Sequence, residues 1–160
     1  QLEITNNIIE LTQKALENSR RIAHDLLPPV LEKFGLHAGI EELVEEFNST
    51  KTVKVSYENT IDFESYPIEK HLHIFRILQE LLNNSLRHGK ATKVSIQFTT
   101  FDDRKTCTYI DNGLGFDSSH EENQKGLGMM NIESRINFLG GDFSFTSKPN
   151  EGVKMVFNFK

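Results

Sequence analysis

The sequence predicts an α+β fold: a two-layer sandwich of about three helices on a mixed, mostly antiparallel sheet, preceded by one long helix. Hydrophobic residues recur at helical spacing in long stretches, and they alternate with polar residues in several short ones. The last two alternating stretches flank a short segment with Pro and Gly, which is typical of a hairpin. With 160 residues, 37% hydrophobic and 26% charged, the chain is long enough for one domain and a helical appendage.

Residues 2–27 form the first predicted element, one long helix. One row of mostly apolar residues, here called the seam, recurs at alternating steps of four and three, which is typical of a coiled coil or helix bundle. We interpret residues 1–27 as part of a helical stalk; the alternative is an amphipathic helix packed on its own domain. Pro28 and Pro29 end the helix, because proline cannot donate a backbone hydrogen bond. The seam consists of Ile4, Ile8, Leu11, Ala15, Asn18, Ile22 and either Asp25 or Leu26.

After a connector at residues 28–35, a single domain is expected over residues 36–160. Its helices and strands follow from the change between helical and alternating spacing of apolar residues. Gly140 and Gly141 close the last helix, as expected for a helix C-terminus. The predicted elements are, in order, a helix at 36–47, a strand at 53–57, a helix at 68–88, strands at 94–98 and 106–110, a loop at 116–128, a helix at 129–139, and a hairpin of strands at 143–146 and 153–159.

Charge and composition exclude several classes of function. The net charge of −5 argues against nucleic acid as a partner. No apolar run is long enough to span a membrane, and no signal peptide is visible. Cys107 is the only cysteine, which excludes an internal disulfide and a cysteine-cluster metal site and favours a cytoplasmic setting. Because the chain begins with Gln1 rather than Met, we expect a fragment or processed product of a protein that could carry a membrane anchor elsewhere.

The helix at 68–88 carries a polar row beside its apolar arc. Glu80, Asn84, Arg87 and His88 follow one another at spacings of four, three and one, so they share one side of the helix. Asparagine is a poor helix former, but its neutral oxygen is a suitable ligand for a Mg²⁺ that phosphates also hold. Taken alone, the row is more typical of a solvated helix surface than of a site. The apolar arc consists of Ile74, Leu78, Leu81, Leu82 and either Ser85 or Leu86.

Two glycine-containing motifs follow further along the chain. At a predicted strand end, Asp111 precedes Gly113 and Gly115, where glycines permit a tight turn and the close approach of a flat ligand. The carboxylate could accept a hydrogen bond from the exocyclic amine of adenine, although the motif alone is equally good turn chemistry. Gly126 and Gly128 lead into the last helix, and exposed N–H groups at a helix start favour anions. This second motif lacks the ending of a Walker loop and the position of a Rossmann fingerprint.

The order of these motifs resembles the ATPase superfamily of gyrase, heat-shock chaperone, histidine kinase and mismatch-repair proteins. Residues 79–88 look like the N box of the kinases, residues 111–116 like the G1 box, and residues 126–130 like the G2 box. The resemblance covers roughly residues 20–160. It implies the Bergerat-type ATP-binding fold, with ATP and Mg²⁺ as cofactors and residues 116–128 as the ATP lid.

The resemblance also implies roles for single residues. Asn84 would ligate Mg²⁺, and Asp111 would bind the adenine amine. Glu80 matches the acidic residue that activates water in the hydrolytic relatives. One departure is that Gly152 is followed by Val153, where the family commonly has a threonine whose hydroxyl helps to bind adenine through water. The implied catalytic pair is Glu80 and Asn84, and the implied nucleotide-binding set is Asn84, Arg87, His88, Asp111, Gly113, Gly115, Lys125, Gly126, Leu127, Gly128 and Met129.

His24 and the acidic residue after it look like the phosphoacceptor box of these kinases. However, Pro28 and Pro29 leave no room for the second helix that would have to follow an acceptor histidine. Residues 20–36 instead resemble the end of the second stalk helix in kinases that pair with LuxR/NarL-type regulators. We therefore expect no phosphoacceptor in this chain, and we expect the acceptor to lie upstream of Gln1.

The resemblance implies that the intact protein is a homodimer through its stalk helices. It would transfer the γ-phosphoryl group of ATP to its own histidine and then to the receiver domain of a response regulator. For the present chain we expect nucleotide binding and self-association through the seam, without autophosphorylation. Two alternatives stay open: a hydrolytic ATPase of the same superfamily in which Glu80 activates water, and a scaffold with a catalytically dead site.

Overall fold

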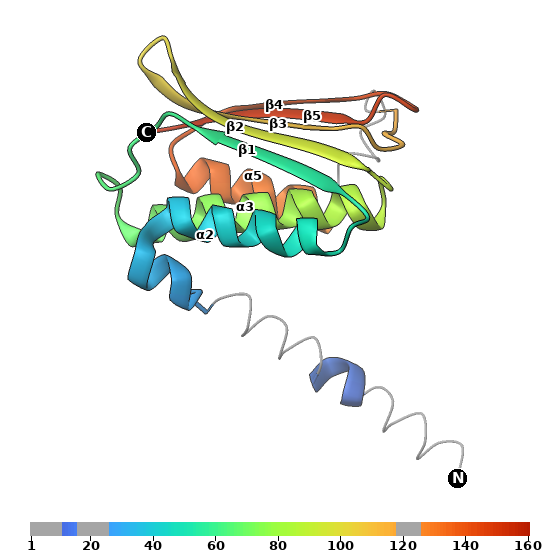
Figure 1. The fold of residues 1–160 in the computed structure, drawn as a ribbon, viewed down its shortest axis with the longest axis horizontal. Coiled ribbons are helices and arrows are strands. Elements are labelled where there is room, and N and C mark those ends of the chain that lie inside the picture. The colour runs from blue at the N-terminus through green and yellow to red at the C-terminus, as the bar shows by residue number, and fades with distance from the viewer. Residues whose placement is uncertain (1–10, 16–25, 118–125) are drawn as a thin grey trace.

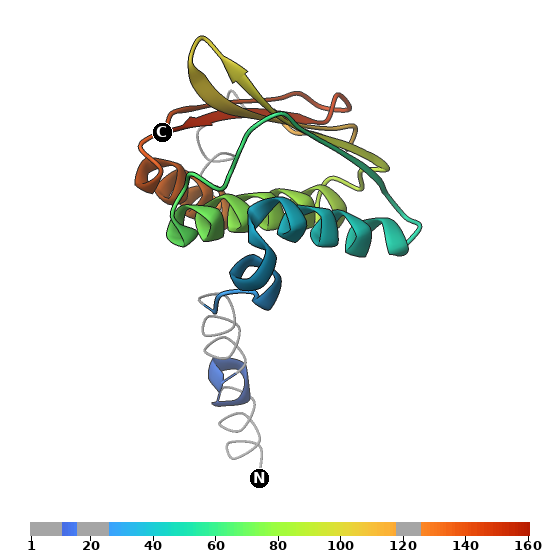
Figure 2. The same cartoon turned by 60° about the vertical axis from the view of Figure 1, so that its left-hand side comes forward.

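A computed structural model describes residues 11–15, 26–117 and 126–160. Its sheet has five strands in the order β1-β2-β3-β5-β4, and the helices lie together on one face of it (Figure 1). Figure 2 shows the same helix layer beneath the sheet from another side. The predicted α+β class is confirmed. Besides the helical residues 11–15, the described elements are α2 (Pro29–Ser49), β1 (Lys54–Asn59), α3 (Ile68–Arg87), β2 (Lys93–Phe101), β3 (Arg104–Asp111), α5 (Leu127–Phe138), β4 (Phe143–Ser147) and β5 (Val153–Phe159).

The sheet is mixed. Strand β1 runs parallel to β2, with Val55 opposite Val94, and every other neighbouring pair is antiparallel. A parallel pair needs a long crossover connection, which here contains α3. Strands β3 and β5 pair so that Asp111, the last residue of β3, faces Val153, the first residue of β5. This register brings the predicted Asp-Gly motif next to the terminal hairpin.

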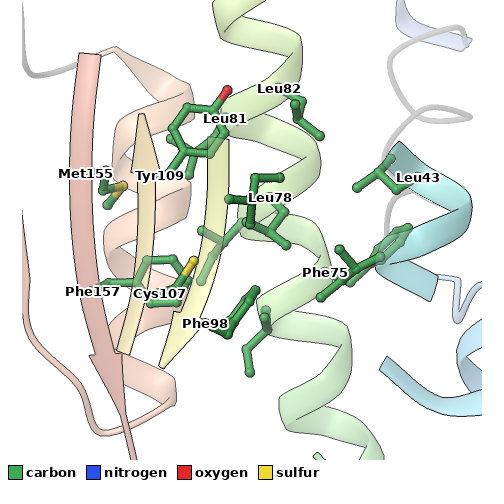
Figure 3. Packing of buried hydrophobic residues seen from close by; sticks show 14 of the residues in the cluster. Leu43, Phe75, Leu78, Leu81, Leu82, Phe98, Cys107, Tyr109, Met155 and Phe157 are labelled. Carbon is green, nitrogen blue, oxygen red and sulfur yellow. The ribbon is translucent and has the colours of Figure 1, made fainter. Parts of the chain in front are cut away.

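Apolar and polar side chains alternate along the strands, so one face of the sheet is buried and the other is solvated. In β2 the side chains of Val94, Ile96 and Phe98 are buried, whereas those of Ser95 and Gln97 between them are exposed. The buried face packs against α3, whose residues Ile74, Ile77, Leu78 and Leu82 are fully buried. Figure 3 shows Leu78 of α3 between the strands that carry Phe98 and Tyr109 and the helix that carries Leu43. The core therefore fills the space between the sheet and the helix layer.

The predicted helix at 36–47 corresponds to the second part of α2, and a short helical segment before it was not predicted. Helix α2 begins at Pro29 and contains a bend at Gly35, whose φ of 79° and ψ of −175° are not helical. Proline is tolerated at a helix start, where its missing N–H has no partner to lose, and glycine accepts the left-handed φ of the bend. Leu31 and Leu36, on either side of the bend, are both buried in the core. The segment predicted as a connector thus adds a helical turn to the domain.

The predicted N-terminal helix falls largely outside the described residues. Residues 11–15 are helical, but the seam positions Ile4, Ile8, Asn18 and Ile22 lie outside the described ranges. The same is true of residues 118–125 in the predicted lid. Among the residues that are described, no helix is both long and apolar enough to cross a membrane.

Candidate functional site

A cavity of about 340 Å³ opens between α3, the start of α5 and the ends of β3 and β5. This volume lies within the usual range for small-ligand pockets. Most of its lining is apolar, and a few polar groups converge on one side, as expected for a site that orients its ligand. The lining residues are Leu81, Asn84, Ser85, His88, Gly89, Tyr109, Asp111, Gly115, Phe116, Met129, Phe145 and Val153.

Asp111 supplies a buried carboxylate to this cavity. Its side chain is 4% exposed, so its oxygens need hydrogen-bond donors to offset the loss of water. Oδ1 accepts hydrogen bonds from the backbone N–H groups of Gly113, at 2.8 Å, and Val153, at 3.2 Å. Oδ2 accepts one from the hydroxyl of Ser85 at 2.5 Å. A carboxylate has about four acceptor positions, so one is left for a ligand that donates a hydrogen bond.

The glycines after Asp111 are required by close backbone approach. A Cβ at Gly113 would lie 2.5 Å from the carbonyl oxygen of Gly89, which already accepts the N–H of Leu114 at 2.7 Å. Gly115 has a φ of +59°, and a Cβ there would overlap the carbonyl oxygen of Lys148. The loop is thereby pressed between the end of α3 and the β4–β5 hairpin, which fixes one wall of the cavity.

The polar row of α3 meets the start of α5. The side-chain amide of Asn84 donates to Oε1 of Glu80 at 3.3 Å, so the amide oxygen of Asn84 remains available as an acceptor or ligand. A Cβ at Gly128 would overlap that same carboxylate oxygen of Glu80, so the start of α5 lies directly against the Glu80 side chain. His88 lines the cavity, at the C-terminal end of α3. Glu80, Asn84 and Gly128 therefore lie in contact with one another.

The structure brings most of the predicted site residues together. Asn84, His88, Asp111, Gly115 and Met129 line the cavity. Gly113 holds the carboxylate, and Glu80 and Gly128 contact Asn84's side of the cavity. The predicted residues Arg87, Gly126 and Leu127 are exposed and do not line the cavity. Lys125 and His24 lie outside the described residues.

Sequence reasoning missed an aromatic wall of the cavity. The rings of Phe116 and Phe145 stack with centroids 5.6 Å apart and an interplanar angle of 27°. Ser147 holds this wall in place: its hydroxyl accepts the N–H of Phe116 at 2.9 Å and donates to the carbonyl of Gly152 at 2.8 Å. Phe116 stands at the end of the predicted motif, but nothing in the sequence indicates that Phe145 of β4 lies opposite it.

Two buried hydroxyls were missed as well. Ser85 was placed on the apolar arc of its helix, and Tyr109 looked like an ordinary strand residue. In the structure their hydroxyl oxygens lie 2.7 Å apart, and Ser85 continues the contact to Asp111. Burial raises the pKa of Tyr109 well above its ordinary value, so its phenol stays protonated at neutral pH. A small polar residue on an otherwise apolar helix face was the available signal.

One end of the cavity has the open acceptor position of Asp111 and the stacked aromatic rings, and the other end has the start of α5. Such a cavity, in this fold, defines a nucleotide-binding domain. Residues 69–160 match the family described as Histidine kinase-, DNA gyrase B-, and HSP90-like ATPase. The chain belongs to this family, and the predicted ATPase superfamily is thereby confirmed.

Curated relatives indicate which type of ATPase domain this is. The chain is 27% identical over 157 residues to the signal transduction histidine-protein kinase/phosphatase DegS of Brevibacillus brevis, covering 98% of this chain and 40% of that protein. It is 30% identical over 135 residues to the sensor histidine kinase MctS of Rhizobium johnstonii, covering 83% and 29%. The chain thus spans well under half the length of these relatives. It is an ATPase domain of the histidine kinase type.

Solved structures confirm the fold. The histidine kinase AdeS of Acinetobacter baumannii superposes with a TM-score of 0.63 at 16% identity, covering 96% of this chain and 80% of that one. The histidine kinase domain of the blue-light activated kinase EL346 of Erythrobacter litoralis gives a TM-score of 0.63 at 18% identity, covering 78% and 63%.

Proposed function

We propose that this chain is the ATP-binding catalytic domain of a sensor histidine kinase. The domain binds ATP together with Mg²⁺ and presents the γ-phosphoryl group to a histidine of the intact protein that is not part of this chain. The single observation that carries the proposal is the buried carboxylate of Asp111, with one acceptor position left open in a cavity of suitable size. The names of the sensor kinases to which the chain is similar support it.

The adenine would lie at the Asp111 end of the cavity. Its exocyclic amine is a donor that fits the open acceptor position of the carboxylate, and its flat ring fits beside the stacked Phe116 and Phe145. Gly113 and Gly115 remove the side chains that would otherwise keep the backbone away from a flat base.

The phosphates would lie toward Asn84 and the start of α5. The amide oxygen of Asn84 is a hard ligand of the kind that Mg²⁺ prefers when phosphates supply further oxygens. The N–H groups at the start of α5, near Gly128, favour negative charge, and His88 lies at the same side of α3. Bound Mg²⁺ supplies neutralisation of phosphate charge, while these residues position the nucleotide.

The whole protein would act as a homodimer. Residues 1–27 would belong to the second helix of its stalk, and a response regulator would receive the phosphoryl group. DegS and MctS are named as a histidine kinase/phosphatase and as a sensor histidine kinase, which supports the transfer of the phosphoryl group to a response regulator. The present chain should not phosphorylate itself, and radiolabelled phosphate on His24 after incubation with labelled ATP would contradict this.

A hydrolytic ATPase is the second candidate. The contact between Glu80 and Asn84 places a carboxylate beside the proposed Mg²⁺ ligand, where it could activate water. Steady release of phosphate by the wild-type chain that disappears in Glu80→Gln would favour hydrolysis. Slow release that is unchanged in this variant would favour the kinase.

Calorimetric titration with ATP, with and without Mg²⁺, tests the proposal. Asp111→Asn replaces an acceptor oxygen by a donor, so affinity should fall about tenfold to a hundredfold, the loss of one hydrogen bond to a charged group. Asn84→Ala should remove most of the gain in affinity that Mg²⁺ provides. Asp142→Asn, at an exposed aspartate, is the matched control and should bind like the wild type. A wild-type chain that binds no Mg-ATP would contradict the proposal.

A further inference from the structure

The carboxylate of Asp111 is held by a chain of two hydroxyl groups that runs through the core. The oxygens of Tyr109 and Ser85 lie 2.7 Å apart, and Ser85 lies 2.5 Å from Oδ2 of Asp111. Serine has one hydroxyl proton, and it is donated to the carboxylate, so Tyr109 must donate to Ser85. The three side chains are 0%, 4% and 4% exposed, so water does not compete with this order of donors.

This chain of donors fixes which way the carboxylate faces. Two backbone N–H groups hold Oδ1, and the hydroxyl of Ser85 holds Oδ2 from the side of α3. With both oxygens held, rotation about the bond to the carboxyl group would break at least one contact. The remaining acceptor position of Asp111 then keeps one direction, and Ser85, Tyr109 and Asp111 all line the cavity.

Val153 lies on the opposite side of the same carboxylate. Its N–H binds Oδ1 at 3.2 Å, and its side chain lines the cavity but carries no hydroxyl. The side chain of residue 153 therefore donates nothing to Asp111. The hydroxyl that reaches the carboxylate here comes from Ser85, one residue after Asn84 on α3.

We propose that Tyr109 and Ser85 form a hydroxyl relay that positions Asp111 for the exocyclic amine of the base. The inference rests on the proposed function, because it concerns how the same cavity recognises adenine. Ser85 and Tyr109 are positioning residues that act through Asp111. The relay should raise the affinity for a purine nucleotide with an amine at position 6 and should not affect the affinity for one without it.

The experiment compares ATP with purine riboside triphosphate, which lacks the amine, by calorimetric titration of the whole chain. Ser85→Ala should weaken ATP about tenfold, because Asp111 is then no longer held in one direction, and should leave purine riboside triphosphate within about twofold. Tyr109→Phe should act in the same direction with a smaller effect, because it removes the donor to Ser85.

Two matched control variants test whether the loss of ATP affinity is specific to the relay. Ser95→Ala, on the exposed face of β2, and Tyr57→Phe, outside the cavity, should bind both nucleotides like the wild type. Equal loss of both nucleotides in Ser85→Ala, or unchanged ATP affinity, would overturn the relay while leaving the proposed function intact. A wild-type chain that binds no Mg-ATP would overturn both proposals.

Discussion

Asp102 and Asp103 form the turn between β2 and β3 with φ values of 49° and 59°. Two positive φ values in a two-residue hairpin match the twist of the flanking strands, and the register confirms that Phe101 pairs with Arg104 across the turn. The left-handed region is sterically costly for a residue with a Cβ, although aspartate tolerates it better than most. The hairpin therefore requires a backbone conformation that both of its aspartates adopt at a steric cost.

Replacing Asp103 by glycine should stabilise the domain. Glycine removes the steric cost of the left-handed conformation, which exceeds the entropy it adds to the unfolded chain, so the free energy of unfolding should rise by about 0.5–1 kcal/mol. Urea denaturation measures the change. Asp142→Gly, at an exposed aspartate without positive φ, should give no such gain. A destabilised Asp103→Gly variant would show that the aspartate side chain has a role in the turn.

At the scale of elements, α3 and α5 meet through a titratable contact. Nδ1 of His73 lies 3.3 Å from a guanidinium nitrogen of Arg135, and its ring stacks on Phe138 with centroids 4.0 Å apart. Burial, and then the charge of Arg135, lower the pKa of His73 below 6.5, while Glu69 acts in the opposite direction. The neutral ring accepts from Arg135, and a protonated ring would have to give up this contact.

This contact should make the domain less stable in mild acid. The unfolded chain binds a proton at His73 more readily than the folded chain, so stability is fully present above pH 6.5 and falls as pH drops below it. His73→Asn keeps an acceptor but does not titrate, so its free energy of unfolding should fall less between pH 7 and about pH 5. Equal slopes for the variant and the wild type in urea denaturation would contradict the assignment.

Periodicity predicted most elements, because each strand and helix has one buried face. It could not predict that β1 runs parallel to β2, since a strand's pattern is the same in either direction. It also missed the helical segment of α2 that precedes Gly35, because the pair Pro28 and Pro29 was interpreted only as a break. Proline both ends one helix and begins the next, and the choice depends on whether Leu31 finds a core to enter.

For the site, residues that act through backbone geometry were predictable and those that act through tertiary contacts were not. Asp111 and the glycines near it stood out because their spacing has a local physical meaning. Ser85 matters only because α3 turns that residue toward β3, where Tyr109 and Asp111 face the same core. No single-sequence pattern encodes which strand a helix face will meet.

At the scale of the whole molecule, α3 joins the site to the segment that enters the domain. The guanidinium of Arg76 on α3 is buried, and it donates to the carbonyl oxygen of Leu26 at 2.8 Å and to Gln79 at 2.6 Å. Glu80, which contacts Asn84, follows Gln79 directly on the same helix. One helix therefore carries both the cavity lining and an anchor for the segment just before α2.

Backbone NMR of the isotope-labelled chain, titrated with Mg-ATP, tests most directly whether the nucleotide occupies the cavity between α3, α5 and the sheet. The amide signals of Gly113 and Val153, which donate to the carboxylate of Asp111, and of Gly89, which lines the cavity, should shift on binding. Those of Ser56 and Ser95, on the exposed face of the sheet, should stay in place. Shifts confined to the exposed face, with the cavity amides unchanged, would contradict the account.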